Sequence, residues 1–200
     1  MAHYFDEQPR ADSDRRSVTW SLPDGPLTLV TDRGVFGHGR VDRGTKLLLL
    51  KVPPPPPGGD LLDLGCGTGA IALTMARRSP AARVWAIDVN ERARELCRLN
   101  AERNGLSNVT VLHPDEVPDS IRFGAIWSNP PIRVGKDALH ALLLRWLERL
   151  APGGEAHLVV QQHLGADSLQ RWLSEQDHRA ERIASGAGFR VLRVGGRRTM

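Results

Sequence analysis

Cysteine is scarce in this sequence, and long apolar runs are missing from it. Only Cys66 and Cys97 occur among 200 residues, without a CxxC pair or the Cys/His spacing of a metal site. This excludes a disulfide framework and disfavours a bound metal. The first ten residues, MAHYFDEQPR, carry charges where a signal peptide needs an apolar core, and no stretch approaches the roughly 18 apolar residues of a membrane-spanning helix. We therefore expect a cytoplasmic chain with reduced cysteines, no membrane association and no metal.

Charge of one sign is not dominant either. Lys and Arg number 27 against 23 Asp and Glu, a formal net charge of +4. An acidic partner such as RNA is compatible with this composition but not required by it. Arginine-rich runs such as residues 10–16 and 179–182 are in most proteins a solvated surface. Hydrophobic residues make up 40% of the chain, which is enough for an α/β domain with a sizeable core. We expect the protein to be a monomer.

Proline and glycine divide the chain at residues 52–59, VPPPPPGG. Five consecutive prolines favour an extended polyproline II spacer. The spacer separates a predicted N-terminal cap, residues 1–57, from a predicted catalytic domain, residues 58–200. Within the cap, SVTWSL and LTLVT flank a Pro-Asp-Gly turn and predict a β-hairpin. The apolar run at residues 47–50 favours a short helix or a buried segment.

Strand and helix patterns alternate regularly after the spacer. Right-handed crossovers between such units build a mostly parallel sheet with helices on both faces. We expect seven strands, the last two forming an antiparallel hairpin at one edge, and a long helix that stops at Pro152-Gly153-Gly154. The expected strands lie at residues 60–65, 83–89, 108–113, 123–131, 155–162 and in two segments of 180–195, and the expected helices at 69–79, 91–105, 136–151 and 165–176.

The turn after the first of these strands reads DLGCGTGA. Ligands bind outside the carboxyl ends of strands in such sheets, and Gly65, Gly67 and Gly69 allow a tight turn and close backbone approach, although glycines also end strands for structural reasons. Asp88 closes the next strand, where a carboxylate can accept hydrogen bonds from both hydroxyls of a ribose. The alternative for Asp88 is a helix cap, a role that Asn90 could fill. Dinucleotide enzymes normally have Gly-x-Gly-x-x-Gly, so this spacing disfavours a dehydrogenase.

Together, LLDLGCGTG and VWAIDVN resemble the class I S-adenosylmethionine-dependent methyltransferases. The resemblance implies a Rossmann-like methyltransferase fold with S-adenosylmethionine as cofactor. In that family the acid before the glycine loop and the loop itself face the methionine half of the cofactor, the acid after the second strand binds the ribose, and an acid after the third strand meets the adenine amino group. By position the implied cofactor-binding residues are Asp63, Gly65, Cys66, Gly67, Gly69, Asp88, Val89 and Asp115, with Glu116 as the alternative to Asp115.

The fourth strand ends with SNPP. Pro130 and Pro131 cannot donate to a ladder and end the strand in any case, but they do not account for Asn129 beside the expected cofactor. An exocyclic amine is a poor nucleophile, because its lone pair is delocalised into the ring. The Asn129 side-chain oxygen and the Pro130 carbonyl can accept its two hydrogens and aim the nitrogen at a methyl donor. We interpret Asn-Pro-Pro as a catalytic site that also borders the cofactor and needs no covalent intermediate.

GVFGHGRVDRGTKLLLL, LLDLGCGTG and SNPPIRVGK, in this order, resemble the methyltransferase small-domain family, which includes ribosomal RNA guanine-N2 methyltransferases. The resemblance implies structured RNA as the acceptor, guanine favoured. A protein glutamine amide is the alternative substrate, and a non-catalytic RNA-binding module is the alternative from another class. Relatives often carry Phe or Tyr to stack on the base where this chain has Ile132, an apolar residue without a π-face. Phe36 and Thr45 match a segment that wraps over the cofactor, and Arg133 and Lys136 are candidates for phosphate contact.

Several residues have structural interpretations beside functional ones. His3, Tyr4 and Phe5 could form an aromatic lid, although the polar first 16 residues favour a loose terminus. Cys66 is interpreted as a space-filling loop residue rather than a nucleophile, because no histidine is near it in sequence. His140 lies in an apolar helix stripe and is interpreted as a packed residue, and no general base is assigned.

Overall fold

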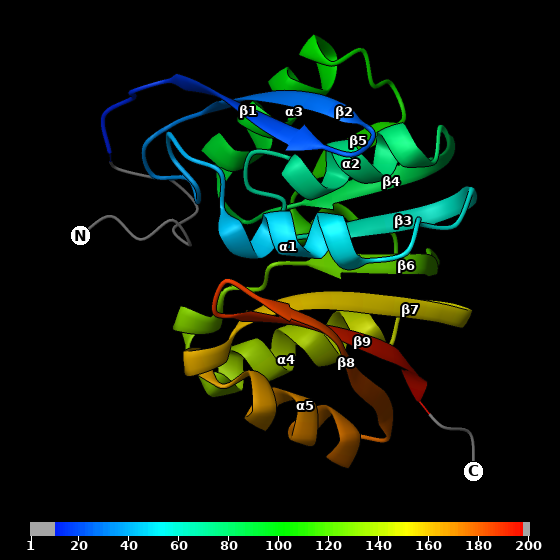
Figure 1. Ribbon diagram of the computed structural model, residues 1–200. Coiled ribbons are helices and arrows are strands. Elements are labelled where there is room, and N and C mark those ends of the chain that lie inside the picture. Colours follow the sequence, from blue (N-terminus) through cyan, green and yellow to red (C-terminus); the bar gives the residue numbers. More distant parts are fainter. Residues whose placement is uncertain (1–10, 198–200) are drawn as a thin grey trace.

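The computed structural model describes residues 11–197, which form a twisted sheet between two layers of helices (Figure 1). The strands of this sheet are β3 (Gly58–Leu64), β4 (Ala81–Ile87), β5 (Val109–Leu112), β6 (Phe123–Ser128), β7 (Leu150–Gln161), β8 (His178–Gly186) and β9 (Phe189–Arg197). Their order is β5-β4-β3-β6-β7-β9-β8, with β9 antiparallel to both neighbours and the other pairs parallel. The predicted seven-stranded α/β fold with a C-terminal antiparallel hairpin is confirmed.

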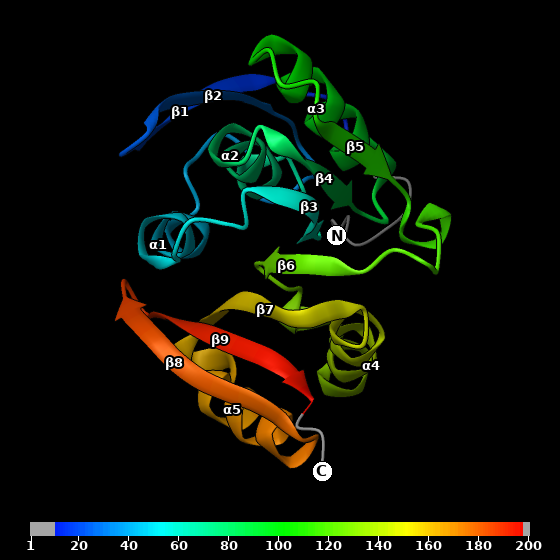
Figure 2. The ribbon, with the colours of Figure 1, turned by 90° about the vertical axis from the view of Figure 1, so that its right-hand side faces the viewer.

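Helices cover both faces of the sheet, as the view in Figure 2 shows. They are α1 (Arg43–Lys51), α2 (Ala70–Arg78), α3 (Glu91–Arg103), α4 (Lys136–Leu147) and α5 (Ala166–Glu175), with short 3-10 turns η1 (Pro114–Glu116), η2 (Ile132–Val134) and η3 (Gln162–Leu164). The first three helices pack on one face through side chains such as Leu48, Leu73 and Cys97, and the last two on the other face through Leu143 of α4 and Leu169 of α5. Apolar residues recur every three or four positions, which puts them on one side of each helix. The segment at 47–50, which the sequence left open, is helical and lies within α1.

The predicted N-terminal hairpin is present as β1 (Arg16–Leu22) and β2 (Gly25–Thr31). It lies over α2 and α3 in Figure 1, and Trp20 and Leu27 are buried in the same apolar cluster as α2. The proline-rich segment leads directly from α1 to β3. A division into units at residue 57 stays a prediction, since the residues on either side of it share one core.

The expected end of the long helix at residue 151 is wrong. α4 ends at Leu147, and β7 already begins at Leu150 and runs through Pro152, Gly153 and Gly154. A Cβ atom on Gly154 would lie 2.7 Å from the carbonyl oxygen of Phe123 in β6. Glycine here permits close approach of two strands, and the ladder between β6 and β7 has a register irregularity at this point.

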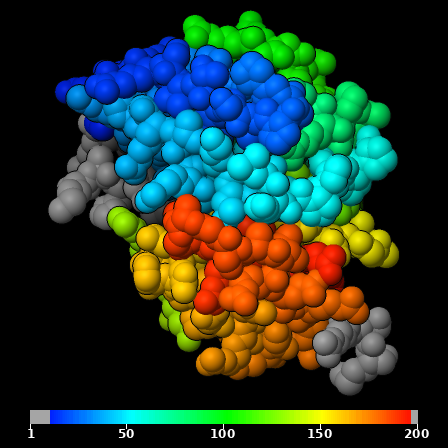
Figure 3. Space-filling model, viewed as in Figure 1, coloured from blue at the N-terminus to red at the C-terminus, as the bar shows by residue number. Residues whose placement is uncertain are grey.

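Segments from opposite ends of the sequence meet beside the sheet. α1 packs against the β8–β9 hairpin, and Figure 3 shows the cyan surface around α1 directly bordering the red surface of β9. The contact depends on small residues, because a Cβ atom on Gly44 would lie 2.7 Å from the Phe189 ring and one on Gly186 would lie 3.1 Å from Leu47. The loop before α1 and the turn between β8 and β9 are thereby brought to the same edge of the sheet.

Candidate active site

A cavity of about 730 Å³ opens at the carboxyl ends of β3, β4 and β6, on the left of the sheet in Figure 1. Its walls come from the glycine loop after β3, the end of β4, the Asn-Pro-Pro segment after β6 and the loop before α1. Among the residues singled out from the sequence, the cavity is lined by Phe36, Thr45, Gly65, Cys66, Gly67, Asp88, Val89, Asn129, Pro130, Pro131, Ile132 and Arg133. Asp63, Gly69, Asp115 and Lys136 are outside this lining.

The three loop glycines have two different roles. Gly65 and Gly67 have positive φ angles of 79° and 51°, and no atom lies within 4 Å of where their Cβ atoms would be. Their backbone therefore faces open space in the cavity. Gly69, with φ of 92°, begins α2, and a Cβ atom on it would lie 2.9 Å from the Cys97 sulfur. Gly69 thus permits close packing of α2 against α3, and contact of Gly69 with the cofactor stays a prediction.

Asp88 is held at the end of β4 by backbone hydrogen bonds. Its Oδ2 accepts from the Gly67 N–H at 2.9 Å and its Oδ1 from the Asn90 N–H at 2.9 Å. Asn90 caps α3 through a bond from the Ala93 N–H, so Asp88 is not needed as the cap. Burial raises the pKa of Asp88, and the backbone donors oppose this. The Asp88 carboxylate lines the cavity in a position to accept further hydrogen bonds.

Asp63 lies behind the glycine loop instead of in the cavity. It is fully buried; its Oδ2 accepts from the Ala72 N–H at 2.9 Å, and its Oδ1 has no partner within residues 11–197. Ala72 is in the first turn of α2, and the N-cap residue of this helix, Gly69, has no side chain that could cap it. Burial raises the pKa of Asp63 to about 8. Direct ligand contact by Asp63 stays a prediction, and the position of Asp63 behind the loop does not favour it. In the structure, Asp63 anchors the N-terminal turn of α2.

Cys66 lines the cavity as a buried thiol. Its hydrogen bond to Cys97 and its burial raise the pKa of Cys66 well above the ordinary value. The thiolate is the nucleophilic form of cysteine, so these surroundings support the space-filling interpretation and disfavour nucleophilic chemistry.

Val89 and Asp115, both predicted to bind the cofactor, differ in position. Val89 is 38% exposed and lines the cavity, where it offers an apolar surface next to Asp88. Asp115 is exposed, outside the lining, and paired with Arg145 at 2.8 Å. The hydrogen bond from Arg145 lowers the pKa of Asp115. Glu116 is bonded to the backbone N–H of His113 in a capping box, so neither acid reaches the cavity in this conformation.

Asn129 has a defined side-chain orientation. Its Nδ2 lies 3.1 Å from Asp42 Oδ1 and 3.0 Å from Thr45 Oγ1. A carboxylate can only accept, so the atom beside Asp42 must be the NH₂ group, and the oxygen is on the other branch of the amide. That oxygen takes no hydrogen bond from the rest of residues 11–197, and Asn129 lines the cavity. The Asn129 oxygen is therefore available as an acceptor for a ligand.

The two prolines shape the backbone after Asn129. The Ile132 N–H donates to the Pro130 carbonyl at 2.9 Å, and Pro131 has φ of −75° and ψ of 77°. These values describe an inverse γ-turn. One lone pair of the Pro130 carbonyl is thus occupied and one remains. The segment offers two acceptors to a ligand, the Asn129 oxygen and the second lone pair of Pro130.

An aromatic face absent at Ile132 is supplied by another part of the chain. Phe189, the first residue of β9, lines the same cavity with Ile132 and Leu164. Its ring lies against Gly44 of α1, which fixes it between that helix and the cavity. Phe36 also lines the cavity and is 40% exposed. Sequence reasoning did not identify Phe189, because nothing near it in the sequence indicates a site.

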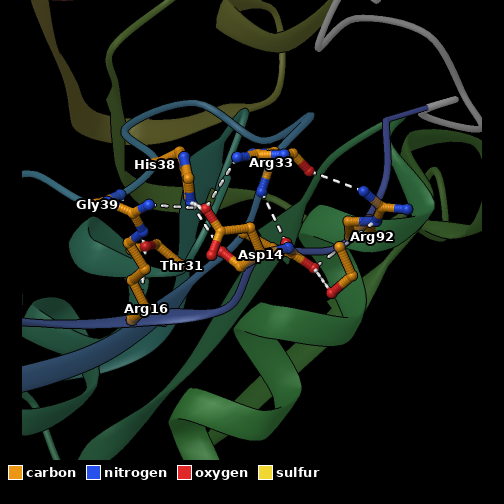
Figure 4. Close-up of polar contacts among 9 residues, drawn as sticks. Asp14, Arg16, Thr31, Arg33, His38, Gly39 and Arg92 are labelled. Carbon is orange, nitrogen blue, oxygen red and sulfur yellow. Dashed lines mark hydrogen bonds and ion pairs between the residues drawn. The ribbon is translucent and has the colours of Figure 1, made fainter.

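The loop before α1 is held by a polar network at its base (Figure 4). Buried Asp32 accepts from the Ser13 hydroxyl and from the N–H groups of Asp14 and Arg33. Burial raises the pKa of Asp32, but these hydrogen bonds outweigh it and lower the value. The ring Nε2 of His38 lies 2.7 Å from the Asp14 carbonyl oxygen, to which it can only donate. Since His38 lines the cavity, this network positions one of its walls.

Asn100 connects the hairpin to the glycine loop. Its side chain accepts from the Val30 N–H at 2.7 Å and donates to the carbonyls of Val30 and Thr68, each at 2.9 Å. It is fully buried. The sequence interpretation missed this residue, although an asparagine in line with the apolar positions Leu96 and Cys97 of a helix was a signal that could have found it.

The remaining predicted residues are outside the centre of the site. Arg133 is exposed at the cavity, whereas Lys136 is exposed at the start of α4. His140 stacks on Trp172 with ring centroids 3.5 Å apart, which supports its packing role. The proposed lid residues His3, Tyr4 and Phe5 lie outside the described part of the chain.

No group of three or more His, Cys, Asp or Glu side chains in residues 11–197 has an arrangement that could hold a metal ion. Within the same range, none of the helices has the length and apolar character needed to cross a bilayer.

Comparison with known proteins places this geometry among methyltransferases. The family model of the methyltransferase small domain matches residues 26–193. The chain is 35% identical to the uncharacterized protein YbxB of Bacillus subtilis, over 96% of this chain and 97% of that protein. It is 40% identical to a ribosomal RNA small subunit methyltransferase C of Pseudomonas aeruginosa, over 92% of this chain and 57% of the relative.

A solved structure shows the same arrangement. The T. thermophilus 16S rRNA N2 methyltransferase RsmC, in complex with AdoMet and guanosine, superimposes with a TM-score of 0.81 and 28% identity, over 94% of this chain and 52% of that one. The chain thus spans about half the length of the ribosomal RNA methyltransferases that it matches.

Proposed function

This chain belongs to the methyltransferase small-domain family, and from that premise we propose that it methylates an exocyclic base amine in structured RNA, with guanine N2 as the favoured acceptor and S-adenosylmethionine as the methyl donor. The observation that carries the proposal is the orientation of Asn129. Its NH₂ group is bound to Asp42 and Thr45, which leaves its oxygen as an acceptor at the cavity. The proposal implies a cytoplasmic protein with ribosomal RNA as its partner.

The cavity suits S-adenosylmethionine. Gly65 and Gly67 leave open space beside their backbone, where any Cβ atom would intrude. The Asp88 carboxylate at the end of β4 matches the chemistry of a ribose diol, which donates two hydrogen bonds. Val89 supplies an exposed apolar surface beside it. When bound, this cofactor supplies an electrophilic methyl group on a sulfonium.

The chain's own contribution is to position the acceptor nitrogen. The Asn129 oxygen and the free lone pair of the Pro130 carbonyl each accept one hydrogen of the amine, which localises the nitrogen lone pair. The γ-turn at Pro131 and the bonds to Asn129 fix both hydrogen-bond acceptors before the base that receives the methyl group binds. Positioning of this kind contributes up to roughly 7–11 kcal/mol in favourable cases. The methylated amine then loses a proton, for which water suffices, and no general base is assigned.

Guanine in RNA is supported by two further considerations. Ile132, Leu164 and Phe189 line the cavity with apolar and aromatic surface, which suits a base taken out of its stack. Relatives at 40% and 28% identity are named as ribosomal RNA methyltransferases, and one of them was solved with guanosine. Since this chain matches about half of those relatives, their substrate is carried over as a proposal.

The test is to add radiolabelled S-adenosylmethionine to RNA and protein fractions from cells that lack this protein. The purified wild-type protein should label RNA, and digestion to nucleosides should yield N2-methylguanosine. The variant Asn129→Ala should bind S-adenosylhomocysteine nearly normally yet transfer no label. Label confined to protein would favour the glutamine-amide alternative, and no label in either fraction would favour a non-catalytic RNA-binding module.

A further inference from the structure

Three arginines at the cavity have no ionic partner among the residues that the structure describes. Arg40, Arg43 and Arg133 line the cavity and are exposed, and within residues 11–197 their guanidinium groups form no ion pair or hydrogen bond. Two nearby arginines differ, since Arg16 of β1 and Arg33 of the loop before α1 pair with Asp14 (Figure 4). The three guanidinium groups at the cavity mouth have no such carboxylate partner among the described residues.

Asn129 links the two segments of the chain that carry these three arginines. Its hydrogen bonds to Asp42 and Thr45 hold the segment 40–45 against the segment 129–133. Arg43 follows Asp42 directly, and Arg133 is in the short turn after the prolines. The arginines consequently line the same cavity as Asn129 from two separate segments of the chain.

The carboxylates in the lining have other partners. Within the described chain the lining contains Asp42 and Asp88. Asp42 Oδ1 accepts from the Thr45 N–H at 2.7 Å and from Asn129. Asp88 accepts from two backbone N–H groups. Neither is paired with an arginine of the mouth, so these guanidinium groups are available to an anionic ligand.

We propose that Arg40, Arg43 and Arg133 bind the phosphates on either side of the acceptor nucleotide of RNA and hold that nucleotide in the cavity. This inference rests on the proposed RNA substrate and identifies how it is gripped. A base can reach Asn129 only after leaving its stack, which costs free energy, and contacts to the flanking phosphates offset that cost. Guanidinium groups suit phosphates because they can donate two parallel hydrogen bonds.

The cofactor's carboxylate is another anion that could attract these arginines, so the test has two arms. The first measures the affinity of the S-adenosylhomocysteine complex for a fluorescein-labelled RNA stem-loop with an unpaired guanine, over a series of salt concentrations. Each of Arg40→Ala, Arg43→Ala and Arg133→Ala should lower the slope of log affinity against log salt by about 0.7 to 1. The control Arg171→Ala removes an exposed arginine of α5 outside the cavity and should leave the slope unchanged.

The second arm measures S-adenosylhomocysteine affinity by calorimetry, which the three substitutions should change by less than twofold. A large loss of this affinity with an unchanged salt slope would assign the arginines to the cofactor and overturn the proposal. So would wild-type slopes in all three variants. If the wild-type protein itself shows no salt-dependent RNA binding, the proposed RNA substrate fails instead, and the two failures are distinguishable. Thermal melting checks that each variant is folded.

Discussion

The side-chain nitrogen of Asn129 lies 3.0 Å from the hydroxyl oxygen of Thr45, a residue 84 positions earlier in the chain. The amide has a donor side, its NH₂ group, and an acceptor side, its oxygen. This contact and the parallel one to Asp42 therefore decide that the oxygen side is left for a ligand. The residue proposed to hold the amine is thus oriented by the N-terminal turn of α1.

We predict that Thr45→Val slows methyl transfer. Valine has nearly the same shape but lacks the oxygen that accepts from Asn129, and one hydrogen bond contributes about 1 kcal/mol. This corresponds to a fall in kcat of roughly fivefold to tenfold. Steady-state kinetics should place the loss in kcat more than in KM, and Thr45→Ser should restore it. Thr19→Val, on the exposed hairpin, is the control, and wild-type kcat in Thr45→Val would contradict the orienting role.

We expect Asp88→Ala to weaken S-adenosylhomocysteine binding by about tenfold or more, because hydrogen bonds to a charged group contribute roughly 1.5–3 kcal/mol. The substitution also leaves the Gly67 N–H without its acceptor. Isothermal calorimetry measures the change, with Asp119→Ala as an exposed carboxylate control. An unchanged dissociation constant in Asp88→Ala would remove Asp88 from the cofactor site.

Asn100→Leu should destabilise the protein strongly. It leaves three buried backbone groups of Val30 and Thr68 without partners, and each such group costs about 1–3 kcal/mol. Urea denaturation should show a loss in the free energy of unfolding of about 3 kcal/mol or more. Asn104→Ala, which removes a side chain bonded to Thr28 at the surface, should lose about 1 kcal/mol or less. Equal losses in the two variants would refute the buried role of Asn100.

Asp63→Asn should alter how stability depends on pH. The pKa of Asp63 is raised from 3.8 to about 8 in the folded chain, so the folded state retains a proton that the unfolded state releases. The stability linked to that proton is fully present below the unfolded pKa and is lost as pH rises towards the folded one.

Asparagine does not titrate, so between pH 5 and pH 8 the variant should gain up to about 4 kcal/mol relative to the wild-type protein, at 1.36 kcal/mol per unit. Denaturation at both pH values measures this difference, with Asp119→Asn as the control. Parallel pH profiles for wild type and Asp63→Asn would show that Asp63 is ionised in the folded protein.

The sequence predicted the elements of the sheet well because those signals are local. Apolar runs, the Gly-x-Gly-x-Gly loop and the proline stop after Asn129 each act within a few residues, and each is found where it was expected. The failure at Pro152-Gly153-Gly154 has a tertiary cause. Glycine there accommodates the Phe123 carbonyl of a neighbouring strand, and a local pattern cannot distinguish that requirement from a helix stop.

The candidate site was predictable where it follows strand ends and not where it depends on packing between distant segments. Asp88 and Asn129 follow strands directly and line the cavity. Phe189 reaches it only because α1 packs on the β8–β9 hairpin. Asp115 has the expected position in sequence, yet a pairing with Arg145 keeps it outside the cavity.

Asn100 is hydrogen-bonded to both the hairpin and the glycine loop, so a change in one of these elements affects the other. A change that loosens the hairpin is transmitted to the Thr68 carbonyl, and through the loop to the Asp88 partner Gly67. In amide hydrogen exchange, Val30 and the loop should open in one cooperative event. Substitutions in the hairpin are therefore constrained by the glycine loop to which it is linked. Grafting the glycine loop and the Asn-Pro-Pro segment alone onto another scaffold would omit the hairpin, whose link through Asn100 holds the glycine loop in position.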